Sequence, residues 1–439
     1  MSDAMAAIKA EARPYLDAIR EDAAEPEWLR DARRAARDAF ASRGFPSRRE
    51  EAWRFTNLRP LVDQIFLPSR RKPGPMVDMD TGLRRYGIEA TETYRLVFIN
   101  GRFSKADSRV GDLPVGVWLA SVTETLAKQP ELVRAAIDQT DLAGGQPFGS
   151  LNAALFNDGF VLALDEGVTL DRPVEIIHIA ETTEAASIHA RNLVALRPDS
   201  RATVIETHIG NGFYWTNTVT QVALSDDAKL THIRVQDEDG EALHFAVTRA
   251  ELAARARYDA FTLTLGAGLS RQDIQVKLGD GARCDVNGAY LLRGDQDATH
   301  AVFVDHAAPN ATTREIWKGV LDNRAHGAFL GSIAVRPAAQ KTDAQQTSRA
   351  LLLSDRASVD TKPELEILAD DVKCAHGAAV GDLDHEALFY LRARGIDLDM
   401  ARRMLVEAFV LEAIDKVEAE DVRAHLANHV RAWLGREAA

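Results

Sequence analysis

The segment LSDDAKLTHIRV, Leu224–Val235, joins a polar turn to a strand-like run, and this arrangement recurs along the middle of the chain. Related turns begin at Leu164, Leu196, Leu278 and Leu353. Leu164, Leu196 and Leu224 stand 32 and 28 residues apart, and Leu278 follows Leu224 after 54 residues, which is nearly two such steps. The spacing therefore indicates a degenerate internal repeat.

The repeat lies within residues 160–377, which read as a long succession of short strands with almost no helical periodicity. Strands joined by Asp/Gly/Ala turns, without helices between them, are typical of coils that stack into a solenoid lined by Val, Ile, Leu and Ala. A two-sheet sandwich is the alternative, but such a domain rarely exceeds roughly 200–250 residues. We therefore predict a mainly β protein with a right-handed parallel β-helix core.

Helical segments flank this core. We expect an N-terminal helical region with a linker at 1–90, a β-helix core at 91–378 with a helical insertion at about 118–142, and a C-terminal helical domain at 379–439. The linker is the Pro- and Gly-rich stretch 68–82. Local signals support these divisions. They are the capping boxes Ser47/Glu50 and Ser121/Glu124 and the hairpin turn Asn100–Gly101.

Composition excludes several classes of protein. A formal net charge of −13 over 439 residues argues against nucleic-acid binding. The chain has no run of about 18 apolar residues and no apolar leader at its start, so we expect neither a membrane span nor a signal peptide. Two cysteines, Cys284 and Cys374, form no disulfide framework, which predicts a cytoplasmic protein. Phosphate-binding and dinucleotide-binding glycine motifs are missing, so nucleotide hydrolysis by this chain itself is not expected.

The candidate chemistry lies in ADDVKCAHGAAVG, Ala369–Gly381. If this stretch is a strand, Cys374 and His376 share one face. Thiolate and imidazole both bind iron, zinc or copper, but a structural metal site usually needs about four ligands. The residue types alone therefore leave two interpretations: a buried cysteine beside a core histidine, or half of a site that a partner chain completes.

Other polar residues have simpler explanations. The basic, acidic and aromatic mixture at 48–55 is typical of a solvated helix face with its aromatics turned inward. Histidines scattered singly over the predicted strands are more often hydrogen-bonded strand residues than ligands. Acidic residues in the turns suggest calcium sites or the carboxylate pairs of polysaccharide-cleaving β-helices, although turn geometry also accounts for them. These acidic residues are Asp165, Asp226, Asp227, Asp280 and Asp355.

The C-terminal segment has an unusual helix. From Met404 to Ile414 only Glu407 and Glu412 interrupt the apolar residues. A helix that is apolar on nearly all sides has more surface to bury than one neighbour covers. Either several helices pack together here, or one face docks on a partner.

Three stretches carry a family resemblance. They are GFPSRREEAWRFTNLRPL at Gly44–Leu61, LLLSDRASVDTKPELEILADDVKCAHGAAVG at Leu351–Gly381, and YLRARGI at Tyr390–Ile396. Together they resemble the SufD branch of the SufB/SufD family, which belongs to the bacterial Suf iron–sulfur assembly machinery. TKPELEI followed by DVKCAHGA is the specific part, and the cysteine-richer pattern of the SufB branch is missing. Ala375 and Ala379 vary within the motif.

The resemblance implies a non-enzymatic scaffold that pairs with SufB through the β-helix and binds the ATPase SufC through the C-terminal helices. His376, with Cys374 beside it, would lie at the SufB interface, His376 serving as a metal ligand. A transient iron–sulfur cluster would be shared there, with no cofactor held tightly by the isolated chain and a homodimer possible when SufB is absent. SufC contact would involve the segment Leu383–Lys416, with Tyr390, Arg392, Arg394, Gly395 and Phe409.

Two alternatives remain at this point. One is a β-helix enzyme that acts on polysaccharides through the turn aspartates, and the other is a purely structural solenoid with Cys374 and His376 in its core.

Overall fold

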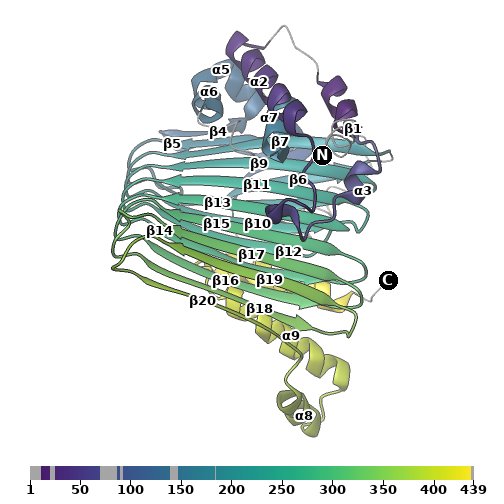
Figure 1. The fold of residues 1–439 in the computed structure, drawn as a ribbon. Coiled ribbons are helices and arrows are strands. Elements are labelled where there is room, and N and C mark those ends of the chain that lie inside the picture. The colour runs from purple at the N-terminus through teal and green to yellow at the C-terminus, as the bar shows by residue number, and fades with distance from the viewer. Residues whose placement is uncertain are drawn as a thin grey trace.

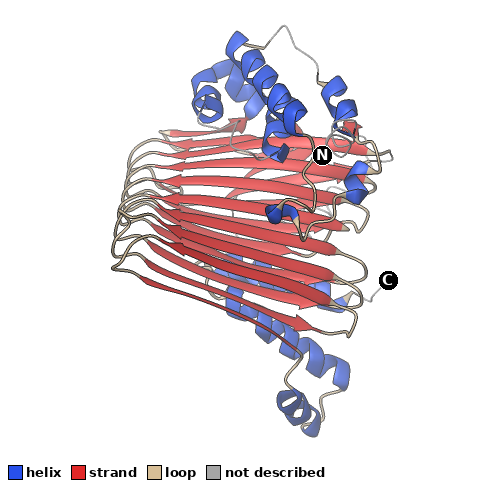
Figure 2. Cartoon of the chain, viewed as in Figure 1, coloured by secondary structure: helices blue, strands red, loops and turns tan. Residues whose placement is uncertain are grey.

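The computed structural model describes residues 11–19, 25–69, 87–88, 92–138, 147–182 and 184–436. Its centre is a parallel β-helix, with helices at both ends of the solenoid (Figures 1 and 2). The predicted mainly β fold with a β-helix core and terminal helices is therefore confirmed. Most of the predicted linker at 68–82 lies outside the described residues.

Successive strands of the solenoid alternate between two sheets, each ten-stranded over the described residues. Sheet A contains β4 (Val117–Ser121), β5 (Phe160–Leu164), β7 (Ala186–Leu196), β9 (Tyr214–Leu224), β11 (Leu243–Leu252), β13 (Leu269–Leu278), β15 (Asp297–His306), β17 (His326–Val335) and β19 (Ser358–Ile367), and β1 (Leu67–Pro68) pairs with β7. Sheet B contains β3 (Arg102–Arg109), β2 (Tyr94–Ile99), β6 (Val174–Glu181), β8 (Arg201–Asn211), β10 (Lys229–Glu238), β12 (Arg257–Thr264), β14 (Arg283–Leu292), β16 (Thr312–Leu321), β18 (Asp343–Leu352) and β20 (Lys373–Gly381).

The leucines of the sequence repeat stack on one another. Leu164 pairs with Leu196, Leu196 with Leu224, Leu224 with Leu252, and Leu252 with Leu278, each at the end of a sheet A strand. This register explains the repeat, because each leucine fills the same interior position one coil later.

Leu353 does not belong to this column. It follows β18 of sheet B, and its N–H donates to the carbonyl of Leu321, so its turn lies at the opposite corner of the coil. The sequence motif grouped the two corners together because both require the same turn residues.

The turns need a residue with a left-handed backbone three positions after the leucine. The residues at this position have φ between 58° and 71°: Gly167, Asp199, Asp227, Arg255 and Gly281. Glycine adopts this conformation without cost, and aspartate tolerates it better than most residues. Backbone geometry thus accounts for much of the Asp and Gly content of the turns.

Small and large side chains alternate inside the later coils. Gly288 pairs with Trp317, and Tyr290 pairs with Gly319, on the adjacent strands β14 and β16. A Cβ atom on Gly319 would lie 2.4 Å from the ring of Tyr290. The two aromatic rings therefore occupy space that only glycine leaves free on the neighbouring coil.

The N-terminal helices cover the first coils. A helix at 11–18 precedes α2 (Glu27–Arg43), the 3₁₀ helix η1 (Glu51–Trp53) and α3 (Arg59–Val62), and α5 (Val122–Lys128), α6 (Pro130–Asp138) and α7 (Pro147–Leu155) lie beside them. Trp53 is buried, stacks on Phe148, and has the guanidinium of Arg271 over its ring at 3.8 Å. Trp53 of the 48–55 segment is thus turned toward sheet A.

The local signals near these helices form as predicted, with one difference. Ser121 caps α5 by accepting the N–H of Glu124, and Asn100 and Gly101 turn β2 into β3 with φ of 50° and 74°. Glu50 accepts the N–H of Ser47 at 3.0 Å, but the helix that follows is a single 3₁₀ turn rather than an α-helix.

The C-terminal helices are α8 (His385–Ala393), α9 (Leu398–Ile414) and α10 (Glu420–Gly435). Apolar residues of α9 and α10, such as Val410 and Leu426, pack against the outer face of sheet B, including Phe261 and Leu263. Much of the apolar surface of α9 is therefore covered by this chain's own sheet. No helix of the described residues has the length and apolarity needed to span a membrane.

The two ends of the solenoid are finished differently. At the N-terminal end β3 pairs antiparallel with β2, and β4 pairs antiparallel with β5. At the other end sheet A stops at β19 and sheet B stops at β20. Helix α8 projects beyond these last strands (Figure 1).

Candidate functional site

Cys374 and His376 lie on β20, the last strand of sheet B. Each occupies an inward-facing position, because their partners on β18 are the buried residues Ala344 and Gln346. Cys374 packs against the apolar core of the solenoid. Both side chains therefore belong to columns that run through the interior of the coils.

The interior is open at this end. Cys374 is half-buried, whereas His376 is exposed, although both stand in columns that are buried one coil earlier. Val380, also on an inward-facing position, is 48% exposed, and Ile367 at the end of β19 and Leu368 after it are exposed as well. An uncovered edge strand with apolar neighbours is a surface that readily pairs with another chain.

A polar column lies behind His376. Gln346 is its neighbour on β18, and the Nε2 of Gln346 donates to Oε2 of Glu315 on β16 at 2.8 Å. Burial raises the pKa of Glu315 to about 8, and hydrogen bonding by Gln346 opposes that shift. The interior behind His376 thus holds a carboxylic acid that stays protonated at neutral pH.

The thiol of Cys374 differs from a typical reactive cysteine. Burial raises its pKa, and a backbone hydrogen bond with Ala344 opposes this only in part. Since the thiolate is the form that binds metals, Cys374 needs a bound metal or a cationic neighbour to deprotonate at neutral pH.

These two residues do not complete a metal site by themselves. Among the described residues, the group of three or more His, Cys, Asp and Glu side chains close enough to hold a metal lies elsewhere, at His178, Glu206 and His208. Cys374 and His376 therefore offer two donor groups at an open surface, and further ligands at this end would have to come from another molecule.

The predicted contact residues on the C-terminal helices fall into two groups. Tyr390 (56% exposed), Arg392 and Arg394 lie on or next to α8, and the guanidinium of Arg394 stands 4.6 Å from the ring centre of Tyr390. Gly395 ends α8 with φ of 86°, a conformation that favours glycine. Phe409 differs because it is half-buried on α9, with Lys318 Nζ 4.3 Å from its ring centre.

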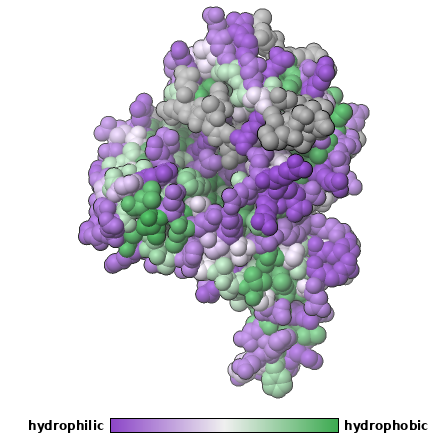
Figure 3. Space-filling view, viewed as in Figure 1, coloured by the Kyte–Doolittle hydropathy of each residue, from purple (hydrophilic) through white to green (hydrophobic). Residues whose placement is uncertain are grey.

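Helix α8 packs only loosely against the rest of the described chain. None of its residues is buried, and Phe389 is 75% exposed. Apolar side chains are visible at this lower end of the molecule (Figure 3). The exposed apolar residues of the last strands and of α8 and α9 are Ile367, Leu368, Val380, Phe389, Tyr390, Met400 and Met404.

Three of the five turn aspartates, Asp226, Asp227 and Asp280, make contacts within the solenoid itself. The carboxylate of Asp227 accepts hydrogen bonds from the guanidinium of Arg255, 2.9 Å from its Nε. Asp226 accepts the N–H of Ala254 at 3.1 Å, and Asp280 accepts a hydrogen bond from the Asn310 side chain. These contacts link neighbouring coils.

Sequence reasoning missed a polar network inside the early coils. Glu206 contacts His208 and His232, and His244 contacts Glu238 at 2.7 Å across the interior. Burial lowers the pKa of His208 despite its contact with Glu206. In the sequence these histidines are scattered singly. His178 and His208 are one coil apart, and this spacing could have predicted that they stack.

The last strand of sheet A is held by a histidine bridge. His326 on β17 contacts Asp297 of β15 through Nδ1 and Asp360 of β19 through Nε2, both at 3.0 Å. The hydrogen bond with Asp297 is the main cause that raises the pKa of His326 to about 9, against the effect of burial.

This bridge predicts a pH-dependent stability. The pKa of histidine is about 6.5 in an unfolded chain, so protonated His326 stabilises the fold fully below about pH 6.5 and loses that effect as pH rises through its folded pKa. His326→Gln should therefore lower the thermal midpoint more at pH 6 than at pH 10. His385→Gln, at an exposed histidine, is the control. Equal losses for His326→Gln at both pH values would contradict this role.

A family model described as "SUF system FeS cluster assembly, SufBD core domain" matches residues 178–409, and one described as "SufBD protein N-terminal region" matches residues 4–176.

Several curated proteins are similar over most of their length. An iron–sulfur cluster assembly SufBD family protein of Synechocystis is 32% identical over 94% of this chain and 93% of its own. The chloroplastic protein ABCI7 of Arabidopsis thaliana is 30% identical over 92% and 86%. The iron–sulfur cluster assembly protein SufD of Escherichia coli is 28% identical over 87% of each chain.

Proposed function

Because this chain belongs to the SufBD family of iron–sulfur cluster assembly proteins, we propose that it is a SufD-type scaffold without catalytic activity of its own. It pairs with a SufB-type subunit through the open end of the solenoid and binds a SufC-type ATPase through α8 and α9. The observation that carries this proposal is the uncovered last coil, where His376 and Cys374 stand in interior columns that have no further coil above them.

In this proposal His376 supplies half of a shared site. Imidazole nitrogen binds iron well, so His376 is the stronger ligand candidate. The protonated thiol of Cys374 is the weaker one, since it must lose its proton to bind a metal. The nascent cluster is then a transient cargo held between the two subunits.

The C-terminal helices connect the proposed ATPase-binding surface to sheet B. Helix α8 has no fully buried residue and joins α9 through Gly395, while α9 runs back to the outer face of sheet B. There Lys318 of β16 is buried and its Nζ lies 2.5 Å from Glu412 of α9. A force applied at α8 by an ATPase would reach the sheet through this contact.

The cysteines and the open end of the solenoid also support proposals about location and self-association. The assembly works in the cytoplasm, where unpaired cysteines such as Cys284 and Cys374 persist. When no SufB-type partner is present, a second copy of the chain pairs with the open end, because β19 and β20 still present unpaired backbone groups.

His376→Ala should lower iron–sulfur cluster formation by at least about tenfold in the reconstituted three-subunit complex, on the scale of losing support at a metal site. The complex should still purify intact, since His376 is exposed and supports no buried contact in the described structure. Cluster formation is followed by visible absorbance and acid-labile sulfide. Lys373→Ala, on the same strand but facing outward, is the control. Full activity of His376→Ala would remove this residue from the site.

A double substitution tests the ATPase surface. Phe389→Ala with Tyr390→Ala should weaken binding of the SufC-type subunit about 10- to 100-fold, as expected when central aromatic contacts are truncated. Pairing with the SufB-type subunit should not change. Binding is measured by calorimetry, with Val115→Ala, a fully exposed apolar residue elsewhere, as the control. Unchanged affinity for the ATPase would show that it docks at another surface.

A further inference from the structure

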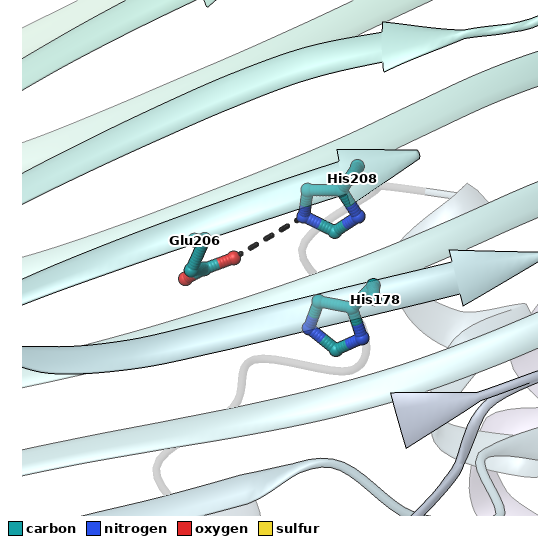
Figure 4. Close-up of side chains that lie close together, drawn as sticks. All are labelled: His178, Glu206 and His208. Atoms are coloured by element: carbon teal, nitrogen blue, oxygen red, sulfur yellow. Dashed lines mark hydrogen bonds and ion pairs between the residues drawn. The ribbon is translucent and has the colours of Figure 1, made fainter. Parts of the chain in front are cut away.

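The coil repeat brings two histidines together inside the solenoid. His178 on β6 and His208 on β8 pair in register, with ring centroids 4.6 Å apart and planes 10° apart. Glu206 precedes His208 by two residues, so it points from the same strand to the same side. Figure 4 shows the carboxylate of Glu206 beside the two stacked rings.

The donor atoms of these residues are close enough for one ion. One atom from each of His178, Glu206 and His208 lies within 4.8 Å of the other two. Oε2 of Glu206 and Nε2 of His208 are 3.4 Å apart, which is about the separation of two ligands on one tetrahedral zinc ion. A tilt of the His178 ring would bring the third donor to a similar distance.

Two of these donors lack good partners. Nε2 of His178 is buried and makes no hydrogen bond among the described residues. Oε1 of Glu206 is bonded by His232 at 2.8 Å, but Oε2 receives only two contacts of 3.4 Å, from His208 and Arg234. Buried polar atoms are seldom left in this state unless an ion or a water molecule satisfies them.

Charge and space also favour a cation. Of the described residues near the rings, Glu206 and Glu238 carry carboxylates and Arg234 carries a guanidinium, which also contacts Thr220 and Thr248. A cavity of about 10 Å³ borders both rings. This volume is about that of one water molecule or ion, and a positive ion there would lie beside the carboxylate of Glu206.

We propose that His178, Glu206 and His208 bind one divalent first-row transition-metal ion, such as zinc or iron(II), inside the solenoid. Two imidazole nitrogens and one carboxylate oxygen are a donor set suited to these ions. The ion links β6 to β8 and replaces missing hydrogen bonds. This site is separate from the open end, since β6 and β20 are seven strand spacings apart in sheet B, roughly 30 Å. It also departs from the expectation that the isolated chain holds no cofactor tightly.

The test uses the purified full chain without partners. The protein is stripped with a chelator, refolded in the presence of Zn²⁺ or Co²⁺, and desalted, and bound metal is then measured by mass spectrometry and by cobalt absorbance. Wild type and His300→Gln, which alters a buried histidine outside the cluster, should each hold about one ion per chain. His178→Gln and His208→Gln should each weaken binding at least about tenfold.

Two further measurements separate this site from the proposed assembly site and identify the ligand atoms. The Cys374→Ser, His376→Ala variant should bind as wild type does, which separates this site from the proposed assembly site. X-ray absorption of zinc-loaded wild type should show nitrogen and oxygen ligands without sulfur, and this holds even if His208→Gln fails to fold. The proposal is overturned if wild type retains no ion, which would assign the space to water, if sulfur ligates the metal, or if His178→Gln binds as tightly as wild type.

Discussion

Parallel pairing between successive coils is the interaction on which this structure depends. Each strand satisfies its backbone groups only through the coils above and below it, so the fold has no natural end. The chain closes the first end itself with two antiparallel pairings, β2 with β3 and β4 with β5, and with the N-terminal helices. It leaves β19 and β20 uncovered at the other end. The backbone groups on the outer edges of β19 and β20 are therefore left without a neighbouring strand among the described residues.

The interior of the solenoid is not uniformly apolar. The first halves of the sheet B strands point Val174, Val204 and Leu230 inward, whereas their second halves carry charged and imidazole groups. A second polar column, formed by Glu315 and Gln346, leads to His376 at the open end. Burying such groups is costly unless each finds a partner, and Gln346 provides one for Glu315.

Much of the architecture could be predicted from the sequence because it follows from local rules. The leucine spacing gave the coil period, and the left-handed turn positions explain the Asp and Gly residues that follow each leucine. The assignment of Leu353 failed because both corners of the coil obey the same turn chemistry. The inward direction of Cys374 followed only when its neighbour Ala344 was known to be buried. Local sequence patterns predict the length of a coil and its turns, but they do not predict which residues of successive coils stack on one another.

The site was harder to predict because it depends on contacts between residues one coil apart. His178 and His208 looked unrelated at the sequence level, and their stacking requires the register of β6 and β8. The sequence placed Phe409 in the partner-contact segment, but it did not show that this residue packs beside Lys318 against the sheet. Similarly, no sequence pattern shows that His376 is exposed while its column neighbour Gln346 is buried.

Hydrogen–deuterium exchange tests the central claim, that the open end of the solenoid is where the chain meets its SufB-type partner. The amides of β19 and β20 should exchange quickly in the chain alone and slow markedly when the partner is added, because strand pairing protects backbone N–H groups. The strands of the middle coils should change little. Unchanged exchange in β19 and β20, with protection appearing on another surface, would contradict the account.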